Sequence, residues 1–150
     1  MHKLVTAGLV AASVLFMAEA GAQVKPETLV KQRQAAMTLI GKYWGPMGGM
    51  MQGRVPYDAA VVQRNAGYLN ALDKMPWDGF QESTKGEKSA ALPAIWEKPG
   101  EFKQAQDRLQ SEVAKLVEVS KGGDEAAVKA QLGAVGKSCG GCHESFRQKQ

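Results

Sequence analysis

Histidine and cysteine are scarce in this 150-residue sequence, which contains two of each. His2 lies in an N-terminal segment that we expect to be removed, so His143 is the one histidine of the mature chain. A structural zinc site needs about four cysteine or histidine ligands, more than this chain can supply. The sequence also offers no second mature histidine, no paired acid and base in an evident site and no substrate loop, so we do not expect an enzyme.

Strand-like alternation of apolar and polar residues is also missing, as is any long hydrophobic run after the N-terminal one. The first absence predicts an all-α fold, and the second predicts a mature chain with no membrane segment. Basic residues are dispersed among acidic and small ones, as at Lys121, Lys129, Lys137, Arg147 and Lys149. We therefore expect no nucleic-acid partner, and a net charge of +4 favours a solvated surface with a weak preference for acidic redox partners, none of them identified by the sequence.

The N-terminus has the pattern of a secretory signal peptide. Lys3 is followed by a nearly continuous apolar run from Leu4 to Ala18, and Ala20-Gly21-Ala22 has the small-x-small spacing of a cleavage site. The apolar run is shorter than the roughly 20 residues that span a bilayer, which argues against a membrane helix. We expect residues 1–22 to be cleaved and residues 23–150 to form a single exported domain.

Two helices are predicted in the first half of the mature chain. The first begins at Pro26, a residue suited to the first helical turn, and Gly45-Pro46 is expected to kink or end it. Its inward stripe consists of Val30, Arg33, Met37, Ile40 and Trp44, and Met47, Met50 and Met51 extend the same face. The second helix is capped by Asp58 and stops before Pro76, with Val62, Ala66, Leu69 and Leu72 on its apolar face.

A long connection and two further helices are predicted in the second half. Three prolines and three glycines between Pro76 and about Gly100 indicate a connection that Trp77, Phe80 and Trp96 anchor against apolar surface. The third helix carries Phe102, Ala105, Leu109, Val113 and Leu116 and closes at Gly122-Gly123. Asp124 caps the fourth, whose stripe is Leu132, Val135, Cys139, Cys142 and Phe146. Four such helices predict an antiparallel four-helix bundle.

The sequence Cys139-Gly-Gly-Cys142-His143 is the attachment motif of c-type haem. Residues three apart lie on one helical face, so both thiols can add to the vinyl groups at one edge of the macrocycle, and the adjacent imidazole can ligate the iron. A thioredoxin-like dithiol would need a preceding strand, and a disulfide closing so short a loop would stabilise little. We expect one covalent haem c per chain, beside the C-terminal helix.

The sixth ligand position of this haem depends on the first helix. A bis-histidine haem is excluded, and only seven residues follow His143, so a methionine ligand cannot come from a downstream loop. Met37 lies at the centre of the first helix's inward stripe, where its sulfur either binds the iron or packs over an open face. The remaining methionines of the mature chain are weaker candidates: Met47, Met50, Met51 and Met75.

Over essentially the whole mature chain, the sequence resembles the cytochromes c′, the class II c-type cytochromes. The resemblance lies in the C-terminal haem motif followed by Phe146-Arg147, Arg33-Gln34-x-x-Met37, Val55-Pro56-Tyr57-Asp58-Ala59-Ala60, Met75-Pro76-Trp77 with Phe80, and Ile95-Trp96. It implies an antiparallel four-helix bundle, a periplasmic location and a homodimer packed through the first two helices. It also implies thioethers at Cys139 and Cys142 and His143 as fifth ligand.

The resemblance further implies roles for residues of the first helix. Arg33 and Gln34 match positions that contact the haem propionates, and Met37 matches the distal position that crowds the vacant face. Arg33 on the surface in a helix ion pair is the alternative, but it shares the stripe of Met37, which favours propionate pairing. The alternative for Met37 is an ordinary core residue, and a core methionine can also pack against the haem without binding its iron.

Aromatic and basic residues complete the predicted pocket. Trp77 and Phe80 match aromatic residues that line it, and they also anchor the long connection. Phe146 is expected to line the pocket and to continue the apolar stripe of the fourth helix into the core. Arg147 matches a basic residue beside the proximal histidine, with a solvated helix-end cation as the alternative.

Two functions follow from the resemblance. In the first, a high-spin, five-coordinate haem binds nitric oxide, and carbon monoxide more weakly, with possible electron transfer. An apolar distal face offers dioxygen no hydrogen-bond donor, whereas nitric oxide needs little such help. In the second, Met37 is the sixth ligand of a low-spin electron carrier. The overall match favours the first.

Overall fold

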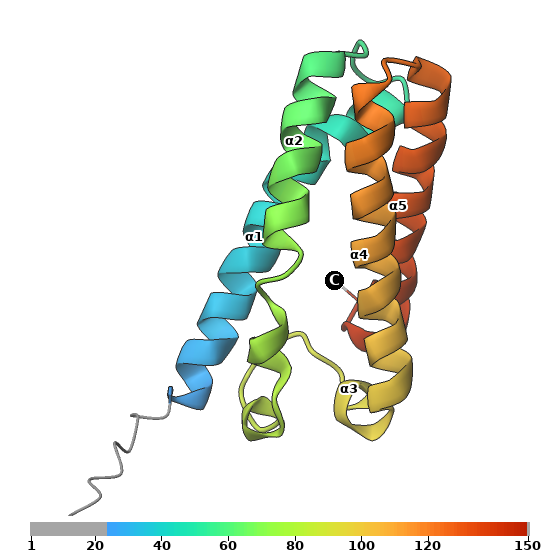
Figure 1. Ribbon diagram of the computed structural model, residues 1–150. Helices are drawn as coiled ribbons and strands as arrows, with labels where there is room; N and C mark the ends of the chain where they lie inside the picture. The colour runs from blue at the N-terminus through green and yellow to red at the C-terminus, as the bar shows by residue number, and fades with distance from the viewer. Residues whose placement is uncertain (1–23, 150) are drawn as a thin grey trace, which may run out of the picture.

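The computed structural model describes residues 24–149 as a bundle of long helices with short helical turns at one end (Figure 1). The predicted signal peptide lies outside these residues. The long helices are α1 (Pro26–Met51), α2 (Ala59–Leu72), α4 (Pro99–Lys121) and α5 (Glu125–Phe146). The short ones are the 3-10 turns η1 (Trp77–Phe80) and η2 (Glu82–Thr84) and the single turn α3 (Ala94–Glu97). The described residues form no named strand, so the predicted all-α fold is confirmed.

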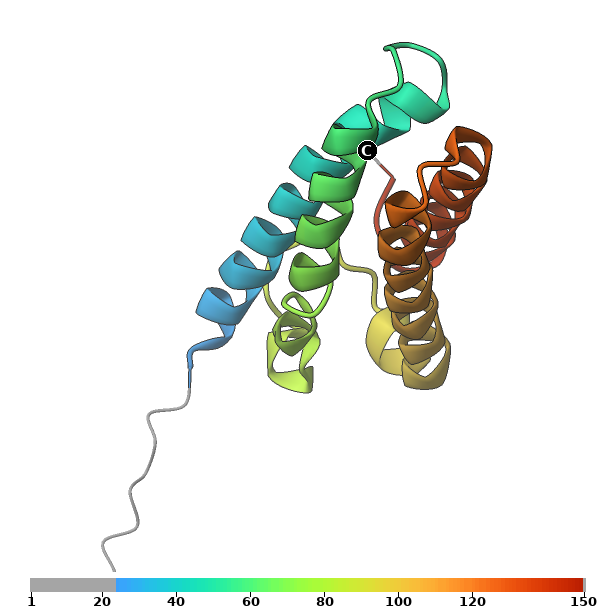
Figure 2. The same cartoon turned by 45° about the horizontal axis from the view of Figure 1, so that its top comes forward.

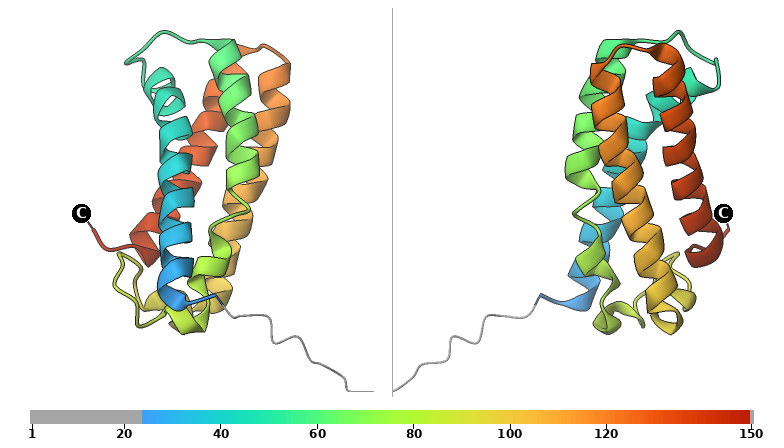
Figure 3. Two further views of the ribbon diagram at one scale, coloured as in Figure 1. Left: turned by 90° about the vertical axis from the view of Figure 1, so that its left-hand side faces the viewer. Right: turned by 45° about the vertical axis from the view of Figure 1, so that its right-hand side comes forward.

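The four long helices run alternately up and down, as predicted for an antiparallel bundle. Figures 2 and 3 show α1 beside α2 and α4 beside α5, with η1, η2 and α3 crossing between the two pairs at the end where α1 begins. Short connections join α1 to α2 and α4 to α5, and such connections favour antiparallel neighbours. The long connection therefore closes one end of the bundle.

Local signals define the helix ends. Pro26 and Pro99 stand at the first helical positions of α1 and α4, where a missing N–H costs nothing. The Asp58 carboxylate accepts a hydrogen bond from the Val61 amide at 3.0 Å, which confirms the predicted cap of α2. The Asp124 carboxylate caps α5 by accepting from the Ala126 amide at 2.9 Å and the Ala127 amide at 3.3 Å.

Two predicted boundaries differ from the structure. Helix α1 does not end at Gly45-Pro46 but continues to Met51, because Met47 and Met50 are buried in the core and their packing holds the turn after the proline. The segment between Pro76 and Gly100, predicted as a connection without elements, contains η1, η2 and α3. Their turns are too short to leave a helical period in the sequence.

The hydrophobic core fills the part of the bundle nearer the α1–α2 and α4–α5 connections. It is built from the predicted stripes: Met47, Met50, Val62, Ala66, Leu69, Val113, Leu116, Val128, Leu132 and Val135. Towards the other end the stripes of α1, α4 and α5 continue, but Met37, Leu109 and Cys139 are only half-buried there. No helix among the described residues is long and apolar enough to cross a membrane. The inward faces diverge where the core stops, and they leave a cavity.

Candidate functional site

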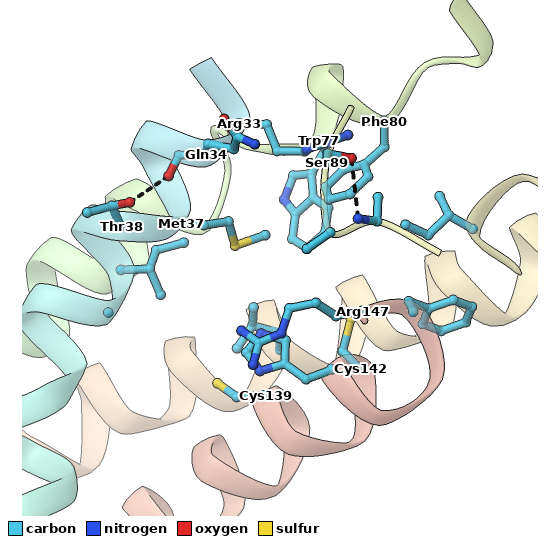
Figure 4. Close-up of a pocket in the computed structure, with 18 of the residues that line it drawn as sticks. Arg33, Gln34, Met37, Thr38, Trp77, Phe80, Ser89, Cys139, Cys142 and Arg147 are labelled. Atoms are coloured by element: carbon cyan, nitrogen blue, oxygen red, sulfur yellow. Dashed lines mark hydrogen bonds between the residues drawn. The ribbon is translucent and has the colours of Figure 1, made fainter. Parts of the chain in front are cut away.

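The cavity has a volume of about 530 Å³, within the roughly 300–1,000 Å³ of small-molecule sites. Its walls come from α1, α4, α5 and the long connection (Figure 4). All ten residues predicted for the site line it: Arg33, Gln34, Met37, Trp77, Phe80, Cys139, Cys142, His143, Phe146 and Arg147. The structure therefore brings together residues more than 100 positions apart in the sequence.

Helix α5 presents both cysteines to the cavity from one face. Cys139 and Cys142 are free thiols whose sulfurs point into the cavity in Figure 4. Desolvation is the main cause that raises the pKa of both thiols, so they are neutral S–H groups near pH 7. Two neutral thiols one helical turn apart fit addition to two vinyl groups on one edge of a planar ligand.

His143 follows directly and borders the same cavity. Desolvation lowers the pKa of His143, and the positive charge of Arg147 lowers it further. The imidazole is therefore neutral near pH 7, the state in which a ring nitrogen can donate its lone pair to a metal. Among the described residues no cluster of three histidine, cysteine or carboxylate side chains could hold a metal ion.

The wall opposite α5 comes from α1 and is mainly apolar. The Met37 sulfur points into the cavity (Figure 4), and Ile40 and Trp44 continue the wall. The Thr38 hydroxyl is occupied, because it donates to the Gln34 carbonyl at 2.9 Å. The other methionines considered as ligands are absent from the lining among the described residues: Met47 and Met50 are buried in the core, Met51 packs against it, and Met75 is 60% exposed.

Arg33 is the buried charge of the site, with only 4% of its surface exposed. Its guanidinium donates to the Gly79 carbonyl, and its Cζ lies 4.4 Å from the centre of the Phe80 ring. Desolvation lowers the pKa of Arg33, and within residues 24–149 no carboxylate forms an ion pair with it. Buried charges in proteins are normally paired. The predicted partner, an anionic propionate of the haem, would supply the missing charge.

Four aromatic rings form a continuous side wall. The ring centres of Phe80 and Phe102 are 4.9 Å apart, and those of Phe102 and Phe146 are 5.2 Å apart, both edge to face. The centre of the Trp77 ring lies 6.0 Å from the ring centre of Phe80 and 6.0 Å from that of Phe102. Phe102 was predicted only as core, although its place on the α4 stripe was a signal for this wall.

The chain beyond α5 pairs with the long connection at the cavity rim. Arg147 and Ala91 form an isolated antiparallel bridge, in which the Leu92 amide donates to the Phe146 carbonyl at 3.0 Å. The Gln148 amide donates to the Ala90 carbonyl at 2.8 Å. This pairing holds Arg147 beside His143. Nothing in the sequence around 89–92 indicated that this segment lines the site.

Comparison with known proteins agrees with this geometry. Residues 28–147 match the family model described as Cytochrome C′. A curated cytochrome c′ from Alcaligenes xylosoxydans xylosoxydans is 39% identical over 126 residues, which cover 84% of this chain and 98% of the relative.

Solved structures of similar proteins share the fold as well. Cytochrome c prime from Shewanella frigidimarina has a TM-score of 0.80 and 34% identity, covering 83% of this chain and 98% of that one. A nitric oxide complex of a mutant cytochrome c prime from Alcaligenes xylosoxidans has a TM-score of 0.76 and 39% identity, covering 84% of this chain and 98% of that one. At these identities and coverages the similarity extends over nearly the whole described chain.

Proposed function

The chain belongs to the cytochrome c′ family and carries covalently bound haem c, and on this premise we propose that it binds nitric oxide at a five-coordinate haem iron. Carbon monoxide is a weaker ligand of the same site, and electron transfer is a secondary capacity. The observation that carries the proposal is the α1 wall, where Met37 crowds the side opposite His143 and the Thr38 hydroxyl is already occupied. The relative's nitric oxide complex supports this choice of gas.

Different residues of the chain would bind different parts of the haem. Cys139 and Cys142 would hold the haem through thioethers, and the neutral imidazole of His143 would bind its iron. When bound, the haem would supply an iron that can take up a diatomic gas. Arg33, which has no carboxylate partner within residues 24–149, would pair with a propionate, and Gln34 would contact the propionates nearer the rim.

The two faces of the haem would meet different surroundings. Met37 and the apolar α1 wall exclude polar ligands, and they give dioxygen no hydrogen bond, which nitric oxide does not need. Trp77, Phe80 and Phe146 exclude water from the side. Arg147, held by its pairing with Ala91, lies beside His143, where it would contact a gas bound on that side of the haem.

The proposal extends to location and assembly. Residues 1–22 act as a cleaved signal peptide, and residues 23–150 work in the periplasm as a single non-enzymatic domain. Two copies form a homodimer through α1 and α2, whose shared face exposes Leu39 and Tyr68. An acidic protein is the expected redox partner, since the net charge is +4.

The second candidate function is a low-spin electron carrier with Met37 as sixth ligand. The observation that favours it is the Met37 sulfur itself, which points into the cavity (Figure 4). Ligation would remove the open position that gas binding requires. The two functions therefore predict different spectra.

The absorption spectrum of the holoprotein tests the choice. We expect a broad reduced Soret band that shifts when carbon monoxide is added. Met37→Leu, which removes the sulfur and nearly conserves volume, should leave this spectrum unchanged. Met37→Ala should speed carbon monoxide association about tenfold, equivalent to removing about 1.4 kcal/mol of barrier. A sharp reduced α-band and a methionine-to-iron charge-transfer band, both lost in Met37→Leu, would instead establish the electron carrier.

A further inference from the structure

A carboxyl group is buried at the C-terminal end of α2, outside the site described above. Asp73 is the C-cap residue of this helix and is 1% exposed. Neither side-chain oxygen has a hydrogen-bond partner among the described residues. A carboxylate at this position also faces the negative end of the helix dipole. The environment of Asp73 therefore disfavours the ionised form on two independent grounds.

The main chain of Asp73 joins three elements. Its carbonyl accepts a hydrogen bond from the Trp77 indole N–H of η1 and another from the Gln110 side-chain amide of α4 at 3.0 Å. Its amide donates to the Leu69 carbonyl of α2 at 2.8 Å. The same indole of Trp77 forms part of the cavity wall (Figure 4). A movement of the Asp73 main chain would therefore displace the Trp77 indole, and with it the cavity wall, through the hydrogen bond between them.

One cation approaches the carboxyl. Lys74 Nζ forms a salt bridge with Asp73 Oδ1 at 3.0 Å, and the Lys74 side chain is 53% exposed, so solvent weakens this pair. Burial raises the pKa of Asp73, and Lys74 offsets only part of that rise. Asp78 of η1 is exposed to solvent.

The neighbouring elements contribute no further charge to the carboxyl. On α4, Gln110 is neutral, and Lys103 and Asp107, on the same side of the helix, pair with each other. Within residues 24–149, Lys74 is the only cation that forms a salt bridge with Asp73. A change of pH would therefore act on this junction mainly through Asp73 itself.

We propose that Asp73 is a proton-controlled positioning residue for the Trp77 wall of the haem cavity. When the carboxyl carries its proton, it stays packed in the junction, and its carbonyl holds the indole. When the proton leaves to solvent, the carboxylate turns towards Lys74 and water, which loosens the Trp77 anchor and changes the surroundings of the haem. The inference rests on haem occupying this cavity, and it does not depend on which gas binds there.

The Soret band of the holoprotein, recorded against pH, tests the coupling. We expect a reversible one-proton change in the wild type and its loss in Asp73→Asn, whose spectrum should stay in the low-pH form. Lys74→Met should move the midpoint to higher pH, because it removes the one nearby charge that stabilises the carboxylate. An unchanged transition in Asp73→Asn, or an unshifted midpoint in Lys74→Met, overturns the proposal.

A second measurement reports on the carboxyl without the haem. The infrared difference spectrum should be recorded from about pH 5.5 upward, where exposed Asp and Glu side chains are already ionised. It should contain the C=O band of a carboxyl that is still protonated, and Asp73→Asn should lack that band. If Asp73→Asn does not fold, Asp73→Ser serves as the neutral variant. The band persisting in the neutral variant assigns the titration to another group and rejects the proposal. Failure of the proposed function would appear in the gas-binding spectra, whereas failure of the present proposal would appear in the infrared band of Asp73. The two failures are therefore distinguishable.

The urea midpoint of unfolding, measured against pH, shows whether loss of the Asp73 proton destabilises the folded chain. The pKa of Asp73 is raised in the folded chain, so the folded state holds this proton to higher pH than the unfolded state. The wild-type midpoint should therefore fall, relative to that of Asp73→Asn, as pH rises from about 4 through the folded pKa. Below about pH 4 the difference between the two midpoints should no longer change with pH, because the carboxyl is then protonated in both the folded and the unfolded chain. Parallel curves over the whole range would contradict the proposal.

Discussion

Close packing around Arg33 shows how a single backbone position shapes the site. The guanidinium lies between the Gly79 carbonyl and the Phe80 ring, and a Cβ built on Gly79 would stand 2.8 Å from the Leu29 carbonyl oxygen and closer still to the Arg33 side chain. Both obstacles belong to the first turns of α1. Only a residue without a side chain lets η1 approach α1 this closely, and that approach buries the charge of Arg33.

Gly79→Ala should lower the free energy of unfolding by about 1–3 kcal/mol, the range for an overpacked interior, because α1 and η1 must move apart. It should also perturb the Soret band, since Arg33 and Phe80 both line the cavity. Urea unfolding and absorption spectra of the holoprotein would measure both effects.

The matched control for this substitution is Gly86→Ala. Gly86 lies in the same connection, is exposed, has no heavy atom within 4 Å of its built Cβ and lacks a positive φ. We expect it to have no measurable effect on the spectrum. Equal effects of the two substitutions would show that the approach of η1 to α1 does not set the position of Arg33.

At the scale of one element, α5 depends on both of its ends. Asp124 caps the first turn through two hydrogen bonds, and the pairing of Arg147 with Ala91 follows the last turn. Cys139, Cys142 and His143 all lie in the half of α5 nearer this pairing. The helix therefore holds the haem motif between a local cap and a long-range contact.

Asp124→Ala should reduce stability by about 1 kcal/mol, because the amides of Ala126 and Ala127 lose their acceptor. Asp124→Ser keeps a capping oxygen and should cost only a few tenths of that. Thermal unfolding of the holoprotein would measure the difference. If both variants lose the same stability, the cap is not the cause, and the charge of Asp124 at the helix N-terminus is.

Across the whole molecule, the outer face of α1 and α2 exposes two large apolar side chains. The rings of Tyr43 and Tyr68 contact each other at a tilt of 46°, with centres 4.6 Å apart, and Leu39 lies one turn before Tyr43 on the same face of α1. Leu39 is 40% exposed and Tyr68 is 45% exposed. Figure 3 shows these two helices side by side on one side of the bundle. This is the surface that we propose for the homodimer.

Leu39→Glu should weaken dimerisation at least about tenfold, or about 1.4 kcal/mol, because the interface would bury a charge on each protomer. Sedimentation velocity over a range of protein concentrations would measure the dissociation. Met75→Glu is the control, since Met75 is 60% exposed and lies beyond the end of α2. A monomeric wild type, or equal weakening by the two substitutions, would exclude this face.

Local sequence signals were enough to predict the long helices and the chemistry of the haem motif. Helical spacing, proline at first positions and two aspartate caps are local properties, and they placed the four long helices correctly. The Cys139 to His143 spacing is equally local, because one helical turn is enough to put both sulfurs on one face. His143 is the one histidine outside the expected signal peptide, and this count limited the candidate iron ligands without any structure.

The way in which the remaining site residues meet follows from the packing of the helices and could not be predicted from the sequence. The continuation of α1 through Pro46, the burial of Arg33 against Gly79, the pairing of Ala91 with Arg147 and the enclosed carboxyl of Asp73 all depend on contacts between segments far apart in the chain. The periodicity of one helix carries no information about the depth at which another element packs against it. The cavity itself exists because the inward faces of α1, α4 and α5 diverge beyond the core, a property of the packed bundle that no single segment contains.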